Sequence, residues 1–239
     1  MSWIETAGTP QLLAWLEGFS GLALVFIFIF LGILIALADA IGKKDPDNPE
    51  LTRKIVHIGA SNVILLAWWW EIPTVVILVA ALLAGLVAIA SYSLPILSSI
   101  NSVGRKSWGT FFYAVSIGLL VGYFWPIHQP LYAAIGILIM GWGDGMAALV
   151  GQNFGKHPYQ FWGMGKSWEG SITMAAVSFV ITSTLLLLVQ GSDWKTWGVS
   201  FGVAIAAAIL EVFSKWGIDN LVVPLGSASL AFILNARIL

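Results

Sequence analysis

A single aspartate stands in a long uncharged stretch, within the segment Gly141-Trp-Gly-Asp-Gly-Met-Ala-Ala-Leu-Val-Gly151. An ionised carboxylate such as Asp144 is costly near lipid unless a cation accompanies it, so the position predicts a metal ligand or a general base. Gly143, Gly145 and Gly151 would let a ligand or a neighbouring backbone come close. Asn153, two residues beyond this segment, is a further candidate for ligand contact. The alternative is a packing face of small residues whose one buried aspartate pairs with a loop lysine.

A second cluster, Gly163-Met-Gly-Lys-Ser-Trp-Glu-Gly170, combines glycine, lysine and a hydroxyl group. It is not a Walker A motif, because Gln160 stands where that motif needs its first glycine. A lysine beside a helix N-terminus can still bind an anion: Gly165 exposes backbone N–H groups, Lys166 supplies charge and Ser167 caps the helix. Glu169 would suit the helix dipole or hold Mg²⁺. The alternative is a capped helix start with an interfacial lysine.

Arg105, Lys106 and Ser107 form a third polar group. The triplet Lys-Ser-Trp occurs at 106–108 and again at 166–168, each time just before a predicted span. A cation and a cap at a helix entrance would again suit a phosphate group. Ordinary flanking charge explains the spacing equally well.

Arg53 and Lys54 open another predicted span, and His57 follows about one turn later. Cations at a helix start oppose the helix dipole, which a bound anion would offset. The spacing places His57 on the same helical face as the two cations. His57 is therefore either a catalytic group or a hydrogen-bonding residue of the interior.

Several cations beside clustered carboxylates suit a nucleoside triphosphate with Mg²⁺. Phosphoryl transfer needs positioning, cations on the phosphates, and a base or metal near the acceptor hydroxyl, with little covalent work from the protein. The set consists of Arg53, Lys54, Arg105, Lys106, Lys156 and Lys166 with Asp39, Asp144, Glu169, Glu211 and Asp219.

The composition excludes several classes of protein. The chain has 239 residues and no cysteine, with 59% hydrophobic and 10% charged residues, whereas soluble domains carry about 25% charged residues. Its mean hydropathy of +0.90 indicates an integral membrane protein. A net charge of -1 gives no long-range attraction for nucleic acid, and none is expected as a partner.

Uncharged stretches define the elements that must position these residues. A helix crosses the bilayer core with about 20 residues. We therefore expect an all-α, polytopic membrane bundle of seven or eight transmembrane helices, forming one domain over residues 1–239. The spans are expected near 19–38, 55–71, 73–92, 109–125, 131–149, 171–189, 195–213 and 221–237, and the sequence leaves open whether the last one crosses fully.

Alternating spans place four loops, 39–54, 93–108, 150–170 and 214–220, on one face. These loops hold all but Lys195 and Arg237 of the eleven Lys and Arg residues, so the positive-inside rule predicts that this face is cytoplasmic. The tail 1–18, which has no lysine or arginine, then lies on the other side. The tail also lacks a basic leader, so no cleaved targeting peptide is expected.

The polar residues collect at this one face. A transporter would place polar groups at mid-bilayer depth in paired broken helices, and Asn62 and Ser116 are the candidates for that role. The asymmetry favours an enzyme that acts on a lipid-like substrate at the interface, with a small-molecule transporter as the alternative.

Five motifs, in their order along the chain, resemble those of the polyprenol kinase family. The family groups dolichol kinase, CTP-dependent diacylglycerol kinase, and phytol and farnesol kinases, with phosphatidate cytidylyltransferases as distant relatives, and the likeness is greatest to the phytol kinases. The resemblance extends over most of the chain. It is carried by Arg53-Lys-x-x-His57, Gly104-Arg-Lys-Ser-Trp-Gly-Thr110, Gly143-Asp-Gly-x-Ala-x-x-x-Gly151, Gly165-Lys-Ser-x-Glu-Gly170 and Asp219-Asn-x-x-x-Pro-Leu225.

The resemblance implies an enzyme that transfers the γ-phosphate of CTP or UTP to an isoprenoid alcohol, namely phytol, geranylgeraniol or farnesol. Phytyl phosphate would serve tocopherol, phylloquinone or chlorophyll salvage, in a plasma or thylakoid membrane. The related alternatives are a dolichol or diacylglycerol kinase, or a phosphatidate cytidylyltransferase, which uses the same nucleotide and metal but breaks a different bond. The oligomeric state is not indicated.

The resemblance also assigns residues. The positions required in the family correspond to Arg53, Lys54, Asp144 and Gly151. We expect Asp144 with Glu169 or Asp219 to hold Mg²⁺, and Asp144 or His57 to accept the alcohol proton, beside a catalytic Lys166. The expected nucleotide-binding residues are Arg105, Lys106, Ser107, Gly143, Gly145, Gly151, Asn153, Gly165 and Ser167.

Overall fold

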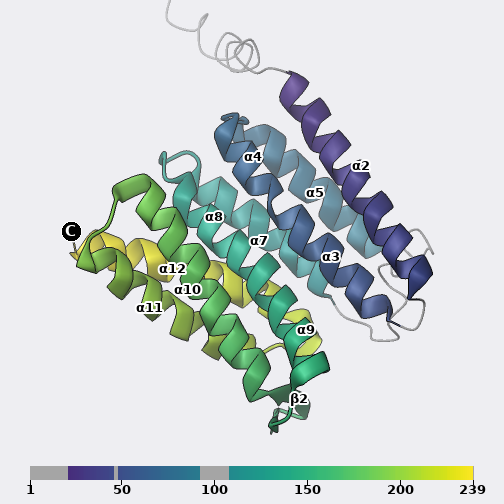
Figure 1. Cartoon of the computed structure of the whole chain (residues 1–239). Helices are drawn as coiled ribbons and strands as arrows, with labels where there is room; N and C mark the ends of the chain where they lie inside the picture. Colours follow the sequence, from purple (N-terminus) through teal and green to yellow (C-terminus); the bar gives the residue numbers. More distant parts are fainter. Residues whose placement is uncertain (1–20, 46–47, 92–107, 239) are drawn as a thin grey trace, which may run out of the picture.

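The computed structural model describes residues 21–45, 48–91 and 108–238, and over these ranges the chain folds into antiparallel helices (Figure 1). The helices are α2 (Gly21–Lys44), α3 (Pro49–Ser61), α4 (Val63–Trp69), α5 (Thr74–Ser91), α7 (Gly109–Phe124), α8 (Pro130–Leu138), α9 (Gly145–Phe154), α10 (Trp168–Gln190), α11 (Trp194–Glu211) and α12 (Asp219–Ile238). The π-helical turn η2 (Ile139–Asp144) joins α8 to α9, and the 3₁₀ turn η3 (Lys215–Gly217) precedes α12. The expected all-α membrane bundle is confirmed.

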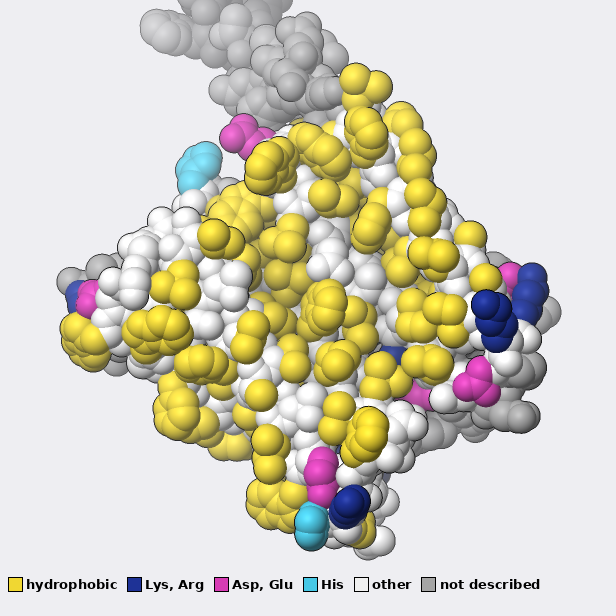
Figure 2. All heavy atoms as spheres, in the orientation of Figure 1, with side chains coloured by type: hydrophobic (Ala, Val, Ile, Leu, Met, Phe, Trp, Pro, Cys, Tyr) yellow, Lys and Arg dark blue, Asp and Glu magenta, His cyan; other side chains and the backbone are white. Residues whose placement is uncertain are grey.

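Among the described residues, five helical segments are long and apolar enough to cross a bilayer: α2, α5, the continuous segment Pro130–Phe154, α10 and α12 up to Ala236. The shorter apolar helix α7 lies among them. The expected spans 55–71 and 195–213 correspond to α3–α4, which is interrupted at Asn62, and to α11, which contains Lys195 and Glu211. Figure 2 shows hydrophobic side chains over the middle of one face, with most charged side chains at its margins.

The centre of the bundle is α8 with η2. Every residue of α8 from Leu131 to Leu138 is buried, and Ile139 to Gly141 continue the buried run. A helix that is apolar on all sides is stable only when other helices surround it. Here α7, α10 and α12 pack around it. Asp144 follows directly on this buried segment, so the protein interior, and not a surface loop, carries the carboxylate.

Two expected loops are largely helical. The loop expected at 39–54 is mostly helix, because α2 continues to Lys44 and α3 already begins at Pro49. Charges end an apolar span but not a helix: Lys43 pairs with Asp39 at 2.6 Å, one turn apart. In the loop expected at 214–220, η3 and the start of α12 take up most of the length. The tail 1–18 and most of the loop expected at 93–108 lie outside the described residues.

The segment expected as a loop at 150–170 contains regular structure. Helix α9 continues to Phe154, and the strands β1 (Pro158–Phe161) and β2 (Met164–Ser167) form an antiparallel hairpin. The turn between them needs left-handed backbone, with φ of 49° at Trp162 and 75° at Gly163. Helix α10 begins at Trp168, three residues before the expected 171.

Candidate active site

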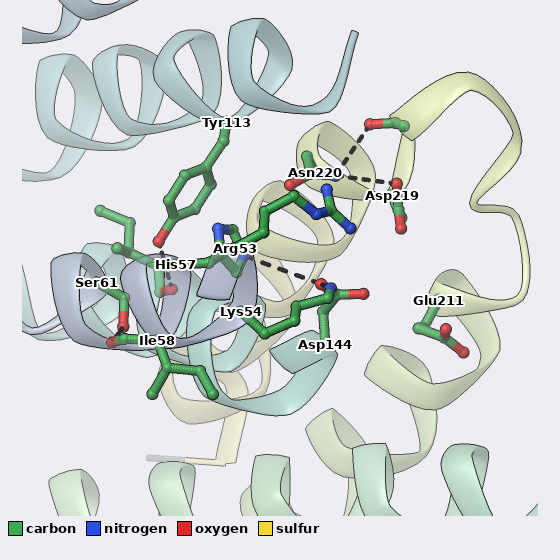
Figure 3. A network of polar contacts seen from close by, with 12 residues as sticks. Arg53, Lys54, His57, Ile58, Ser61, Tyr113, Asp144, Glu211, Asp219 and Asn220 are labelled. Carbon is green, nitrogen blue, oxygen red and sulfur yellow. Dashed lines mark hydrogen bonds and ion pairs between the residues drawn. The ribbon is translucent and has the colours of Figure 1, made fainter. Parts of the chain in front are cut away.

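Charged side chains from five elements of the fold meet at one end of the bundle, and Figure 3 shows those of α3, η2, α11 and α12. Helix α3 supplies Arg53, Lys54 and His57, η2 supplies Asp144, and α12 begins with Asp219 and Asn220. At the same end, the hairpin and the last turn of α11 bring in Lys166 and Glu211. The expectation that Arg53, Asp144 and Lys166 gather at one boundary agrees with this geometry.

Lys54 and Asp144 form the innermost ion pair. The Nζ of Lys54 donates a hydrogen bond to Oδ2 of Asp144 across 90 positions of sequence. The two side chains are only 6% and 12% exposed. A buried carboxylate without a partner would be unstable, so each group depends on the other. This pairing matches part of the packing alternative, since a lysine does accompany Asp144, although that lysine lies on a helix and not in a loop.

His57 lies beside this pair and packs against Tyr113. Its Nε2 is 3.9 Å from Oδ2 of Asp144, is buried, and has no hydrogen-bond partner among the described residues. The ring centroids of His57 and Tyr113 are 4.7 Å apart, and the Tyr113 hydroxyl donates to the carbonyl of Ile137 at 3.1 Å. Tyr113 therefore fixes the imidazole from α7, and Nε2 is left able to bond a ligand.

Arg53 is held by Glu50, one turn earlier on α3. Its Nε and Nη2 donate to the two carboxylate oxygens at 3.0 and 2.5 Å. A two-bond contact of this kind fixes the plane of the guanidinium. Figure 3 shows the side chain reaching toward Asp219 and Asn220, and it lies within range of the charges of Asp144 and Asp219. Asn48 caps α3 by accepting from the Leu51 N–H at 3.2 Å.

Lys166 connects the hairpin to α11. Its Nζ donates to the carboxylate of Glu211 and, at 3.1 Å, to the Glu211 carbonyl. The charge of Lys166 also acts on Asp144 and Asp219. Lys166 therefore belongs to the same electrostatic cluster as Lys54, as expected. In the structure, however, it is bonded to a carboxylate and is not pointing freely at an anion-binding loop.

Glycines let helices pack directly against η2. A Cβ on Gly141 would collide with the side chain of Ser61, and one on Gly145 would collide with Ile58. A Cβ on Gly143 would lie 2.7 Å from Sδ of Met174. The expected nucleotide-binding residues Gly143 and Gly145 are thus at helix–helix contacts, which is the packing alternative. Their absent side chains allow α10 and α3, which carries Lys54 and His57, to pack close to Asp144.

On the hairpin side of the site, Gly151 and Ser167 are close-packed as well, whereas Gly165 has open space around it. The Ser167 hydroxyl accepts from the Gly170 N–H at 3.1 Å, so the expected cap of α10 is confirmed. A Cβ on Gly151 would meet this hydroxyl at 3.0 Å. Gly165 pairs with Gln160 in the hairpin. Asn153 is exposed and bonds the Leu149 carbonyl of its own helix.

The three expected metal ligands are not brought together. Glu169 accepts from His157, with Oε1 2.6 Å from Nδ1, and forms no ion pair with the central cluster. Among the described residues, no three His, Asp or Glu side chains converge as a ready-made metal site. Asp144 and Asp219 do lie within range of each other's charge. Because Mg²⁺ commonly uses one or two carboxylates plus phosphate oxygens, these two residues fit an ion that arrives with a nucleotide.

Three expected residues, Arg105, Lys106 and Ser107, lie outside the described residues. Two residues of the observed site, Glu50 and Tyr113, were missed. Glu50 stands three positions before Arg53, a spacing that favours an ion pair on a helix. The sequence indicates a role for Tyr113 less clearly than for Glu50, because it shows only a hydroxyl-bearing ring one turn inside an apolar span. Glu211 is one of the carboxylates expected at the polar face, but the sequence assigns it no specific role.

Comparisons with known proteins identify relatives along most of the chain. It is 53% identical over 203 residues to a phytol kinase of Synechocystis, covering 85% of this chain and 87% of that one. It is 30% identical over 215 residues to a farnesol kinase of Arabidopsis thaliana, covering 81% and 68%. It is 27% identical over 225 residues to phytol kinase 1 of the same plant, covering 84% and 71%. No protein-family model and no solved structure matches the chain.

Proposed function

Because the chain belongs to the polyprenol kinase family, as a homologue of phytol kinases, we propose that it is a membrane-bound prenol kinase. It transfers the γ-phosphate of a nucleoside triphosphate, CTP or UTP, to the hydroxyl of phytol or of a related alcohol such as geranylgeraniol or farnesol. The alcohol oxygen bonds to the γ-phosphorus, and the bond from that phosphorus to the β,γ-bridging oxygen breaks. The products are phytyl phosphate, a nucleoside diphosphate and a proton.

The convergence of Lys54, His57, Asp144 and Lys166 at the polar end of a membrane bundle is the observation that carries this proposal. An isoprenoid alcohol dissolves in lipid and a nucleoside triphosphate in water. Their reacting atoms can meet only where lipid and water meet, and a cluster of charges at that boundary suits the transfer.

Lys54 pairs with Asp144 and fixes its carboxylate in position. The buried Nε2 of His57, 3.9 Å from Asp144 and without a partner among the described residues, is placed to receive the alcohol proton. Asp144 then stabilises the charge that develops on the imidazole. Arg53, oriented by Glu50, and Lys166 bind the phosphate oxygens.

Charge balance supports a divalent cation. In the described part of the site, three cationic side chains face four carboxylic groups: Arg53, Lys54 and Lys166 against Glu50, Asp144, Glu211 and Asp219. These cations alone do not neutralise a triphosphate. Mg²⁺ held by Asp144 and Asp219 would neutralise phosphate charge and orient the γ-phosphate, and Arg105 and Lys106 would add positive charge.

The decisive experiment is a matrix of nucleotides against isoprenoid alcohols with the purified protein in detergent. γ-Labelled CTP or UTP should pass its label to phytol, and withdrawal of Mg²⁺ should abolish the transfer. Label that reaches lipid only from the α position, with release of diphosphate, would make the protein a cytidylyltransferase. No transfer from any nucleotide to any alcohol would refute the kinase.

A further inference from the structure

An apolar groove of about 410 Å³ runs between α5 and α7. All of its lining residues are apolar side chains or glycines. One end lies at Ile89 and Phe111 and the other at Leu78 and Leu119, a length of about 16 Å along α5 at 1.5 Å per residue. Small-molecule sites have volumes of about 300–1,000 Å³, so the groove has the size of a ligand site.

Glycines keep this groove open. Elsewhere in the bundle, as at Gly136, Gly141 and Gly145, a glycine lies where a Cβ would collide with the next helix. A Cβ on Gly85 or Gly118 would instead meet its nearest neighbours at 3.8 Å, an ordinary contact distance. These two glycines are not needed for close helix approach. Their effect is to leave a hollow between α5 and α7.

The groove and the candidate active site share helix α7. Phe111, at one end of the groove, stands two residues from Tyr113, which packs on His57. That end of α7 is tied to the start of α12, because the Trp108 N–H donates to the Trp216 carbonyl at 3.1 Å, shortly before Asp219. One end of the groove therefore lies beside the first turn of α7, and its other, deep end lies toward the start of α5 and the end of α7.

We propose that this groove binds the isoprenoid chain of the alcohol substrate, with the hydroxyl leaving at the Phe111 end and turning round the first turn of α7 toward His57 and Asp144. The inference rests on the proposed function. A purely apolar, elongated hollow suits an isoprenoid chain and offers no partner for a polar ligand. A groove of fixed length would also let the enzyme distinguish alcohols by length.

Chain length provides the test. Gly118→Phe fills the deep half of the groove and Gly85→Phe fills the half near the site, while Leu83→Phe enlarges an exposed residue of α5 outside the lining. Gly118→Phe should raise KM about tenfold or more for phytol and much less for the shorter farnesol. The longer chain of phytol would lose more apolar contacts when the deep half of the groove is filled. Gly85→Phe should raise KM for both alcohols. Leu83→Phe should change neither, and KM for the nucleotide should stay constant in all three.

The outcomes separate the groove from the function. If the wild-type protein phosphorylates no isoprenoid alcohol, the proposed function fails. If the wild type is active and both glycine variants keep its KM for phytol, only the groove is refuted.

For variants that do not fold, photo-crosslinking of the wild type with a diazirine-bearing phytol gives the second measurement. Label on α5 and α7 that excess phytol displaces supports the groove. Label elsewhere, or displacement by phosphatidylglycerol as effective as by phytol, overturns it.

Discussion

Lys54 on α3 and Asp144 at the end of the π-helical turn η2 form a buried ion pair that connects two segments 90 residues apart. In a π-helix the backbone hydrogen bonds join residues five positions apart instead of four, and such turns are frequent at functional sites. The turn lies at the contact of α3 with the central helix, where Gly141 faces Ser61. The carboxylate is therefore positioned by backbone geometry and charge together.

Removing one partner of this pair should destabilise the protein. Lys54→Met and Asp144→Asn each leave a buried group without its counterpart, at a cost of about 3–5 kcal/mol for an uncompensated charge. The double variant Lys54→Met/Asp144→Leu should regain much of this stability, because apolar residues can replace a buried pair. Thermal unfolding in detergent measures the effect. Single variants that unfold at the wild-type temperature would contradict the buried pair.

The same variants separate stability from catalysis. Turnover should fall by about 100-fold or more in all three, including the restabilised double variant, because groups that stabilise transition-state charge have effects of this size. Activity is measured by label transfer at a temperature where each variant is folded. An Asp144→Asn protein with wild-type turnover would remove Asp144 from the site.

The Arg53–Glu50 contact predicts a specific loss of nucleotide affinity. Arg53→Lys keeps the charge but cannot reproduce two parallel hydrogen bonds. Glu50→Gln keeps the size of the partner and weakens its hold on Arg53. Both should raise KM for the nucleotide about tenfold, as expected for the loss of one charge-assisted contact. Equal increases in KM for nucleotide and for alcohol would indicate a general structural role instead.

Lys166 is expected to act on the nucleotide from the hairpin. Lys166→Met should raise KM for the nucleotide more than KM for the alcohol, because it removes a cation and leaves the groove between α5 and α7 intact. Glu211→Gln is the matched variant: it releases Lys166 from its carboxylate and keeps the cation. A Lys166→Met enzyme with unchanged nucleotide KM would exclude a phosphate-binding role.

The absence of cysteine makes the membrane orientation directly testable. The end of α2 and the connection between α10 and α11 lie at opposite ends of the bundle (Figure 1), and Lys43 in the first and Ser192 in the second are exposed. Lys43→Cys should react with a membrane-impermeant maleimide only after the cytoplasmic side is exposed, and Ser192→Cys should react in intact cells. The reverse pattern would place the active site on the other side of the membrane.

Helix positions could be predicted from the sequence because charge-free runs mark the spans, and Ser167 could be predicted as a cap from its place before an apolar helix. Where a charged residue was taken as the end of a helix, the predicted end was wrong: α2 continues past these charges to Lys44. The π-helical turn was not predicted, because Ile139–Asp144 has no local composition that distinguishes it from an α-helix. The partners of Asp144 and Lys166 depend on tertiary packing between distant segments, and a hydropathy pattern does not contain that information.

The close contact of α3 with η2 gives a last prediction. Gly141→Ala places a Cβ into the Ser61 side chain, and overpacking of this kind costs about 1–3 kcal/mol. The variant should unfold at a lower temperature and lose turnover, because α3 carries Lys54 and His57 away from Asp144. Adding Ser61→Gly should restore both properties, whereas Gly198→Ala, on α11 with open space around it, should cause no loss. A Gly141→Ala protein with wild-type stability and turnover would show that the separation of α3 from η2 does not determine the geometry of the site.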